Sequence, residues 1–277
     1  MQSRSPSAAS RWPWLVVVLV VAGAGWWLFR QNLQGIGDGA APAPQAGAQA
    51  QPVLPSAPPA PEAPAIAHPI DTSASADAAA PALPALADSD APAWEALAQA
   101  AGNDGALGLL LREHLIQRIV VMVDNLTLPS LTRNAMAVKP VDGSLQVQES
   151  DAGMVIAPAN PQRYAPYVQA FTHADAEALV GAYKRFYPLF QQAYAELGKP
   201  NGYFNDRLVE VIDHLLNAPA PAAPVAVEPD GKGHFRYTDP SLESLSVGQK
   251  ALVRLGLEQE AAVKTQLKAI RTALTRM

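Results

Sequence analysis

The chain has 277 residues, a formal net charge of -5 and no cysteine. An acidic chain without clustered Lys and Arg is poorly suited to nucleic acid, because phosphate binding depends on basic side chains. The missing thiols exclude disulfides, a cysteine nucleophile, Cys-ligated zinc and lipid attachment through an N-terminal cysteine.

An uncharged stretch between Arg11 and Arg30 predicts a membrane-spanning helix. Its length of about 18 residues gives roughly 27 Å of α-helix, just enough to cross a bilayer. Tryptophans bracket the stretch at the expected headgroup depths: Trp12, Trp14, Trp26 and Trp27. Arg4 and Arg11 precede it, whereas the next Lys or Arg after Arg30 is Arg112. The positive-inside rule therefore places residues 1–11 in the cytoplasm and the remainder of the chain in the periplasm.

A cleavable secretion signal is the competing interpretation of the same stretch. Ala22, Gly23 and Ala24 resemble a small-residue cleavage site. The apolar run continues past them to Phe29, where a signal would open into polar chain. We therefore expect residues 12–30 to stay in place as a single-pass inner-membrane anchor.

Residues 31–92 predict a disordered linker. They are mostly Ala, Pro, Gly, Ser and Gln, and lack the apolar side chains that offset the entropy of ordering. Repeated proline stiffens such a chain, and about 60 residues could reach on the order of 190 Å stretched or about 45 Å coiled. The linker is either a passive spacer or a ligand for a proline-binding partner.

Residues 93–277 predict a mainly helical soluble domain with two β-hairpins, an α+β fold dominated by α. The first helical pattern is a short segment capped by Ser89 or Asp90 and running through Trp94 and Leu97. A second short helix starts at Asn160 and carries Arg163, Tyr164 and Tyr167. Longer helical patterns cover 105–126, 172–198, 201–218 and 239–277, the last with a break near Gly256. Alternating segments at 144–157 and 224–237 predict the hairpins.

The central helices carry clear end signals. Thr172 with Asp175 resembles a capping box, and Asn201 is a candidate cap for the next helix. Pro188 predicts a kink or break, because proline cannot donate to the carbonyl four residues earlier. The short connection near Gly198 predicts an antiparallel pair of helices.

Three runs carry a family resemblance: PQRYAPYVQAF, YKRFYPLFQQAYAELGKPNGYFNDRLVEVIDHLLNAP and YTDPSLESLSVGQKALVRLG. They resemble a family of bacterial membrane-anchored proteins known as domain of unknown function 3014. The resemblance covers roughly residues 93–274. It implies an envelope protein of this layout and implies nothing about catalysis.

The sequence contains no phosphate-binding loop, GxGxxG turn, GxSxG elbow or HExxH helix. His173 and Glu177 share a helix face, but a metal needs a third ligand, so we expect neither a metal nor a cofactor. His214 follows Asp213 and is either an oriented general base or a structural histidine beside buried leucines. No catalytic residue is assigned.

Tyrosine and arginine concentrate in the middle of the domain, where they predict a binding surface. The candidate binding residues are Arg163, Tyr164, Tyr167, Tyr183, Tyr187, Asp206, Arg207 and His214, with Tyr194 and Tyr203 nearby. The same aromatics at helical spacing are also what a helix core requires. Asp206 and Arg207 are explained equally by a helix cap and surface ion pairs.

Two functions remain open. The first is an uncharacterised single-pass inner-membrane protein whose periplasmic domain binds another envelope protein. The second is a periplasmic enzyme or ligand-binding domain acting on cell-envelope material. Convergence of the candidate side chains on one concavity would favour the second function, and their dispersal or burial would favour the first.

Overall fold

The computed structural model describes residues 65–70, 82–101, 107–131, 135–151, 153–222 and 224–276. These residues belong to a unit of the chain that begins at Pro61. The predicted anchor, residues 12–30, and most of the predicted linker lie outside the described residues. In the part that is described, no helix is both long and apolar enough to traverse a bilayer.

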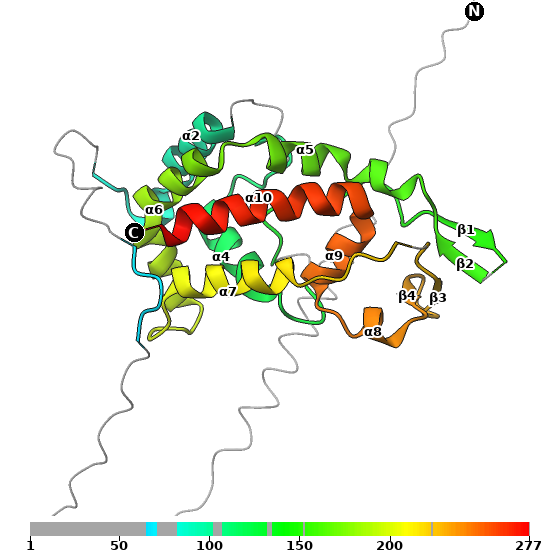
Figure 1. Ribbon diagram of the computed structural model, residues 1–277. Coiled ribbons are helices and arrows are strands. Elements are labelled where there is room, and N and C mark those ends of the chain that lie inside the picture. Colours follow the sequence, from blue (N-terminus) through cyan, green and yellow to red (C-terminus); the bar gives the residue numbers. More distant parts are fainter. Residues whose placement is uncertain are drawn as a thin grey trace, which may run out of the picture. The chain divides into compact units, whose positions relative to one another are not determined.

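Helices make up most of the described chain (Figure 1). They are α2 (Asp90–Ala101), α4 (Leu115–Asn125), α5 (Ala165–His173), α6 (Ala176–Glu196), α7 (Phe204–Leu216), α8 (Pro240–Glu243), α9 (Val247–Leu255) and α10 (Leu257–Thr275), with the 3-10 turns η2 (Leu86–Asp88) and η4 (Asn160–Arg163). The strands are β1 (Val147–Ser150), β2 (Gly153–Ile156), β3 (Val227–Pro229) and β4 (Phe235–Tyr237). The predicted class, mainly α with two hairpins, is confirmed.

The main core lies among α2, α4, α6, α7 and α10. The last helix, α10, packs against both α6 and α7, while α2 and α4 pack against α6 (Figure 1). Aromatic rings from α6 and α7 meet at the centre, where Phe190 and Phe204 stack with ring centroids 5.9 Å apart. The apolar stripe of each helix is therefore buried against its neighbours, as its helical period requires.

The helix predicted over residues 105–126 is much shorter in the structure. It begins only at Leu115, because His114 has a left-handed backbone with φ of 53°. Upstream of it, Leu110 forms an antiparallel bridge with Val138. The carboxylate of Asp90, at the start of α2, accepts from the backbone N–H groups of His114 and Leu115 at 2.8 Å each. Because of this cap from a distant helix, α4 begins later in the chain than the periodic pattern predicts.

Helix α6 begins at a different cap from the one predicted. The carboxylate of Asp175 accepts from the N–H of Ala178 at 2.8 Å, whereas the hydroxyl of Thr172 donates to Val168 within α5. The helix also continues through Pro188 as one element. Of the predicted kink or break, the break is therefore absent: Pro188 is exposed, and contacts on the buried side hold the helix together on both sides of the ring.

Helix α7 has no side-chain cap of its own. Tyr203 stands at the N-cap position, and the predicted cap at Asn201 is not used. Instead, Oε1 of Gln191 on α6 accepts from the N–H of Phe204 at 2.9 Å, and Nε2 of Gln191 donates to the carbonyl of Gly202 at 2.7 Å. A side chain of α6 therefore fixes the start of α7.

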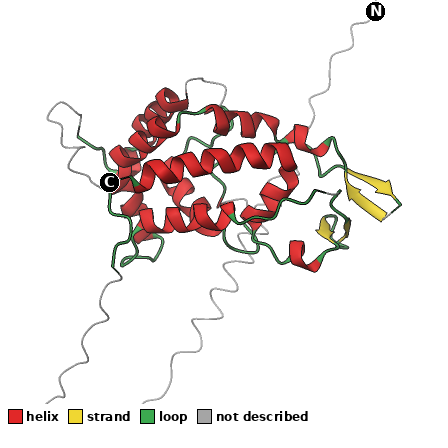
Figure 2. Ribbon diagram, in the orientation of Figure 1, coloured by secondary structure: helices red, strands yellow, loops and turns green. Residues whose placement is uncertain are grey.

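The two hairpins lie together at one end of the helices (Figure 2). Strand β1 pairs antiparallel with β2, and β3 pairs antiparallel with β4. An isolated bridge between Val155 and Ala226 joins the two pairs. Val227 and Tyr237 pack on Val253 of α9 and form a second, smaller apolar cluster.

Folded chain begins upstream of residue 93, where the sequence pattern placed the end of the linker. Residues 65–70, called the strap below, contact α7, and Ile70 is 8% exposed within the main core. Leu86 and Ser89 are also buried. A few aliphatic residues among many Ala and Pro are too sparse to form a periodic pattern, so the sequence pattern missed them.

Candidate functional site

The structure separates the predicted binding residues into several places. Arg163, Tyr164 and Tyr167 lie on η4 and α5; Tyr183 and Tyr187 lie on α6; Asp206, Arg207 and His214 lie on α7. Each of these side chains contacts other parts of the domain. They do not converge on a single concavity.

Arg163 holds a loop in place. Its guanidinium donates to the carbonyl oxygens of Asp142 and Gly143 at 3.0 and 2.9 Å, and to Oδ1 of Asn160 at 3.1 Å. Asn160 is fully buried and donates in turn to the carbonyl of Arg254. The guanidinium also lies 5.4 Å from the ring centroid of Tyr164. Arg163 thus joins the loop before β1 to Asn160, which in turn bonds to α9.

Tyr167 anchors the neighbouring loop. Its hydroxyl lies 3.2 and 3.1 Å from the carbonyl oxygens of Lys139 and Pro140, and its single proton is shared between them. Burial, and then the nearby negative charge of Asp142, raises the pKa of the Tyr167 hydroxyl. The group therefore stays neutral and acts as a donor.

Tyr183 and Tyr187 belong to an aromatic cluster between α6 and α7. The Tyr183 hydroxyl lies 3.3 Å from Oδ1 of Asn205, and the Tyr187 hydroxyl donates to Oε1 of Gln191 at 2.9 Å. Burial raises the pKa of both tyrosines, well above the usual value for Tyr183. Phenols so hard to ionise serve as structural donors rather than as acid–base groups.

Asp206 binds the strap. Its two carboxylate oxygens accept from the N–H groups of Ala67 and His68 at 2.9 and 2.6 Å. Both contacts cross more than a hundred residues of sequence. The carboxylate is thus occupied by a segment that no sequence pattern connects to it.

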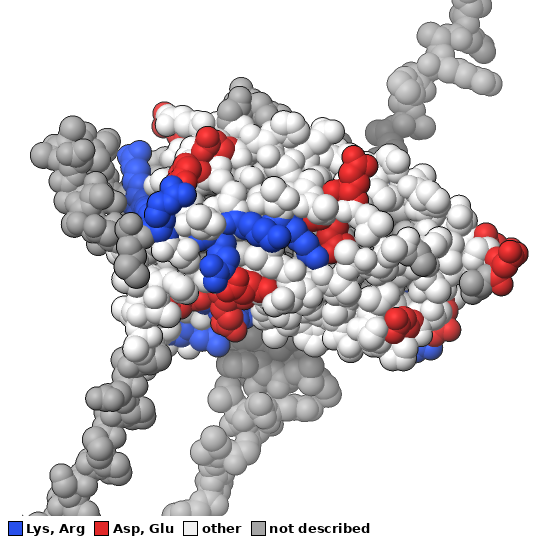
Figure 3. Space-filling model, in the orientation of Figure 1, with Lys and Arg blue, Asp and Glu red and all other residues white. Residues whose placement is uncertain are grey.

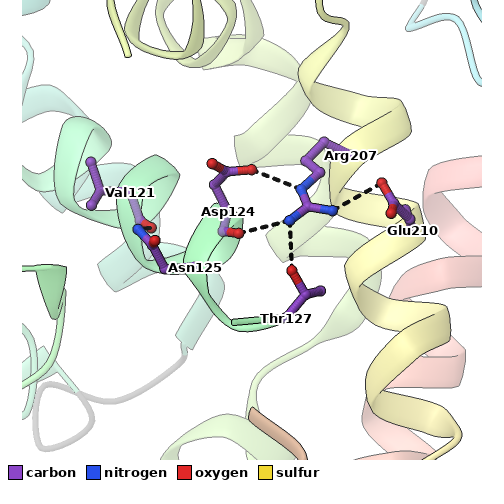
Figure 4. Close-up of polar contacts among 6 residues, drawn as sticks. All are labelled: Val121, Asp124, Asn125, Thr127, Arg207 and Glu210. Carbon is purple, nitrogen blue, oxygen red and sulfur yellow. Dashed lines mark hydrogen bonds and ion pairs between the residues drawn. The ribbon is translucent and has the colours of Figure 1, made fainter. Parts of the chain in front are cut away.

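Arg207 joins α7 to the end of α4 (Figure 4). Its Nε donates to Oδ1 of Asp124 at 2.8 Å, and its Nη2 donates to the carbonyl of Asp124 and the hydroxyl of Thr127. The third nitrogen pairs with Glu210 at 3.0 Å. Burial works against the charged form, but the bonds to Glu210 and Asp124 outweigh it and raise the pKa of Arg207. With its nitrogens directed at these partners, the guanidinium acts as a link between helices.

His214 lies in a structural network. Its Nε2 is 2.8 Å from the hydroxyl of Ser246, which caps α9 by accepting from the N–H of Gln249. The side chain of Gln249 donates back to the carbonyl of His214 at 3.1 Å. The neighbouring Asp213 faces Arg271 instead of the imidazole. His214 is thus held as a structural histidine that ties α7 to α9.

His173 and Glu177 do not share a helix face, contrary to the prediction, because His173 ends α5 and Glu177 lies in the first turn of α6. Nδ1 of His173 contacts the carbonyl of Gln169, and Glu177 pairs with Arg276 at 2.8 Å. Within the described ranges, His, Asp and Glu nowhere form a group of three that could hold a metal ion.

Charged side chains on the face that carries α10 lie close to partners. Basic side chains follow the line of this helix, with acidic side chains beside them (Figure 3). The pairs include Arg271 with Asp213, Arg276 with Glu177, and Lys264 with the buried Glu260. These three cations are therefore neutralised locally.

Two open clefts of similar size lie on the domain. The first, of about 480 Å³, adjoins the strap and the start of α7 and includes Asp206 and Arg207 among its walls. The second, of about 460 Å³, lies beside Trp94, Arg112 and Lys139. Only the first contains predicted site residues, and the polar groups of those two residues already face protein partners.

Sequence reasoning did not assign roles to several residues that organise these contacts. Asn205 and Gln191 support the strap and the start of α7, Asp124 holds Arg207, and Ser246 holds His214. Their common signal is a polar residue within or next to an apolar helical stripe. That signal indicates a buried hydrogen bond, but it does not name the partner.

The structure defines a mainly helical domain that ties a segment of its own upstream chain to its surface. The chain belongs to the family described as "Protein of unknown function (DUF3014)", whose model matches residues 115–271. No curated protein and no solved structure shows significant similarity to the chain. The predicted family is confirmed, and the match begins at α4.

Proposed function

We propose that the chain is a single-pass inner-membrane protein that presents its helical domain in the periplasm to bind another envelope protein. The uncharged stretch at residues 12–30, its flanking tryptophans and the basic residues before it support the anchor and its orientation. The Ala- and Pro-rich chain that follows gives the domain reach from the membrane.

One observation supports binding over catalysis. The candidate side chains are dispersed, and each is engaged by the fold: Arg163 by a loop, Arg207 by α4, His214 by α9. A catalytic site needs its acid, base and nucleophile within reach of one reacting atom. An interaction domain needs only a stable surface.

The topology is tested by fusing the C-terminus to a reporter enzyme that is active only outside the cytoplasm. We expect activity from the full chain and none from a fusion lacking residues 1–30. The protein should also remain in membranes washed with carbonate. If only a reporter that requires the cytoplasm were active at the C-terminus, the proposed orientation would be wrong.

The partner is tested by crosslinking intact cells and purifying the full chain. We expect another envelope protein to be recovered reproducibly, and to be lost when residues 12–30 are replaced by a cleaved signal that releases the domain from the membrane. Recovery of the bait alone would contradict the interaction function.

An enzyme or ligand-binding domain for envelope material is the second candidate. The cleft of about 480 Å³ supports it, because Tyr194, Arg207 and the exposed Glu210 line an opening large enough for a small ligand. Purified protein incubated with cell-wall fragments should then bind or cleave them, and Glu210→Gln should weaken the effect. The absence of both binding and cleavage would exclude this candidate.

A further inference from the structure

The strap is held by side chains at one corner of the domain. The N–H groups of Ala67 and His68 donate to the carboxylate of Asp206, and the N–H of Ile70 donates to the hydroxyl of Tyr203 at 2.7 Å. Nδ2 of Asn205 donates to the carbonyl of His68 at 2.8 Å. Three side chains in one stretch of sequence, called the corner below (203–206), thus hold main-chain groups of the strap.

The side chains of the strap contribute one apolar anchor. Ile70 is 8% exposed and packs in the main core, whereas Ile66 is 53% exposed. Pro69, which has no N–H to donate, stands between His68 and Ile70. The contacts therefore require two residues that are not proline, tolerate proline at the third position, and bury an aliphatic side chain at the fourth.

The corner is held in shape by the domain itself. Asn205 is fully buried, and its Oδ1 faces the hydroxyl of Tyr183. The ring of Tyr203 packs on Tyr187 with centroids 5.4 Å apart. Gln191 fixes the N–H of Phe204. A preorganised set of donors and acceptors lowers the cost of binding a peptide, because little of the site needs to be ordered.

We infer that the corner is a peptide-recognition site for segments with this pattern, and that the chain's own strap is its built-in occupant. A partner's segment with the same pattern would exchange with the strap, and the adjoining cleft leaves room for the residues before it. The exchange with a partner rests on the proposed function. The affinity of the corner for the strap sequence is independent of the proposed function.

Competition depends on how the strap is attached. Only residues 71–85 separate it from η2, so its effective concentration at the corner is on the order of millimolar. A free peptide therefore competes poorly with the intact strap. Weakening the strap should open the site to a peptide added in solution.

The experiment uses the full chain and a fluorescent synthetic peptide of residues 62–72. Ile70→Asp puts a charge where the aliphatic anchor is buried, which should release the strap. Ile66→Asp makes the same change at the exposed isoleucine and is the matched control. We expect the peptide to bind the Ile70→Asp protein at least tenfold more tightly than the wild type or the Ile66→Asp protein, as measured by fluorescence anisotropy.

Two further variants test the corner. Adding Asp206→Ala to the Ile70→Asp protein should abolish peptide binding, and a peptide with aspartate in place of Ile70 should not bind. Equal binding to the Ile70→Asp and wild-type proteins, or binding that survives Asp206→Ala, would overturn the inference.

Hydrogen exchange on the wild-type chain is a second test, which does not require the Ile70→Asp protein to fold. The amides of Ala67, His68 and Ile70 should exchange more slowly than those of an unstructured peptide, and Asp206→Ala should remove the protection of the first two. Exchange at the unstructured rate in the wild type would overturn the inference. If the peptide binds but cells yield no crosslinked partner, the proposed function fails and the recognition site stands.

Discussion

At the scale of single residues, polar side chains that are wholly or partly buried help to define how the helices join. Gln191 is the clearest case, because its amide bonds to three partners: one on α6, one at the start of α7 and one in the connection between them. It accepts from the Tyr187 hydroxyl and the Phe204 N–H, and donates to the Gly202 carbonyl. A helix start without a cap of its own depends on such a group from a neighbour.

Gln191→Met should therefore destabilise the domain while preserving side-chain size. We expect a loss of about 1–3 kcal/mol in the free energy of unfolding, because it leaves several polar groups without partners. Urea unfolding of the purified protein measures the change. Gln192→Met is the control, since Gln192 is exposed and bonds only to Glu196 in the described structure. Similar losses in both variants would contradict the capping role.

Asp213 predicts a pH-dependent contribution to stability. The hydrogen bond from Arg271 lowers the pKa of Asp213 in the folded protein. A lowered folded-state pKa stabilises the protein above the unfolded value of about 3.9, and that stabilisation is lost as the pH falls through the folded pKa.

Wild type and Asp213→Asn should thus differ in stability at neutral pH and converge as the pH falls below about 4. The pair is partly exposed, with side-chain exposures of 37% for Arg271 and 44% for Asp213, so the difference should be no more than about 1 kcal/mol. Thermal unfolding from pH 3 to 7 checks it. A difference that stays constant with pH would show that the carboxylate charge is not responsible.

At the scale of elements, α9 approaches α7 and the end of α4 closely at Gly248. The N–H of Gly248 donates to the carbonyl of Leu126 at 3.0 Å. A Cβ at this position would lie 2.6 Å from Cδ2 of Leu215 and 2.8 Å from that carbonyl oxygen. The contact between these elements therefore requires glycine.

Gly248→Ala should destabilise the domain by about 1–3 kcal/mol, because the backbone carbonyl cannot move away as a flexible side chain could. Gly181→Ala is the matched control within α6, where the described residues place no atom within 4 Å of the added Cβ. That change should stabilise the domain by about 0.5–1 kcal/mol through helix propensity. Chemical denaturation of both variants checks the opposite signs, and equal effects would argue against a close contact at Gly248.

At the scale of the whole molecule, the folded unit extends upstream of its helical pattern. Ile70 and Leu86 are buried in the main core, and Asp90 caps α4. A chain that starts at residue 93 removes all three. It leaves apolar surface exposed and the start of α4 without its acceptor.

A protein starting at residue 93 should be less stable than one starting at residue 61 by at least about 3 kcal/mol, since each buried aliphatic side chain contributes about 1.5–3 kcal/mol. Guanidinium unfolding of the two purified proteins measures the difference. Equal midpoints and slopes would mean that the upstream segments only rest on the surface.

Much of the fold is predictable from local patterns. The amphipathic stripe of α7 and the break before α10 at Gly256 follow from the spacing of apolar residues and a glycine with positive φ. Both hairpins follow from alternation and turn residues, and Asp230 accepts from two N–H groups in the second turn. These features depend on residues a few positions apart, so the sequence contains their cause.

The candidate site was less predictable, because its partners are distant in sequence. Asp206 and Arg207 were recognised as polar residues at a helix start, yet their partners are Ala67 and His68 for the first and Asp124 for the second. Arg163, a candidate for a binding surface, supports a loop through its bonds to main-chain carbonyl oxygens. A side chain's type limits what it can bind, but only the packing of helices determines which group it meets.

By itself the sequence determined the family, the mainly helical class with two hairpins, and most helix positions, because hydrophobic period and turn chemistry act over a few residues. Only the tertiary structure decided where α4 begins, how α7 is capped and where the folded chain starts. Each of those outcomes depends on a hydrogen bond or an apolar contact between segments far apart in the chain, which no local pattern records.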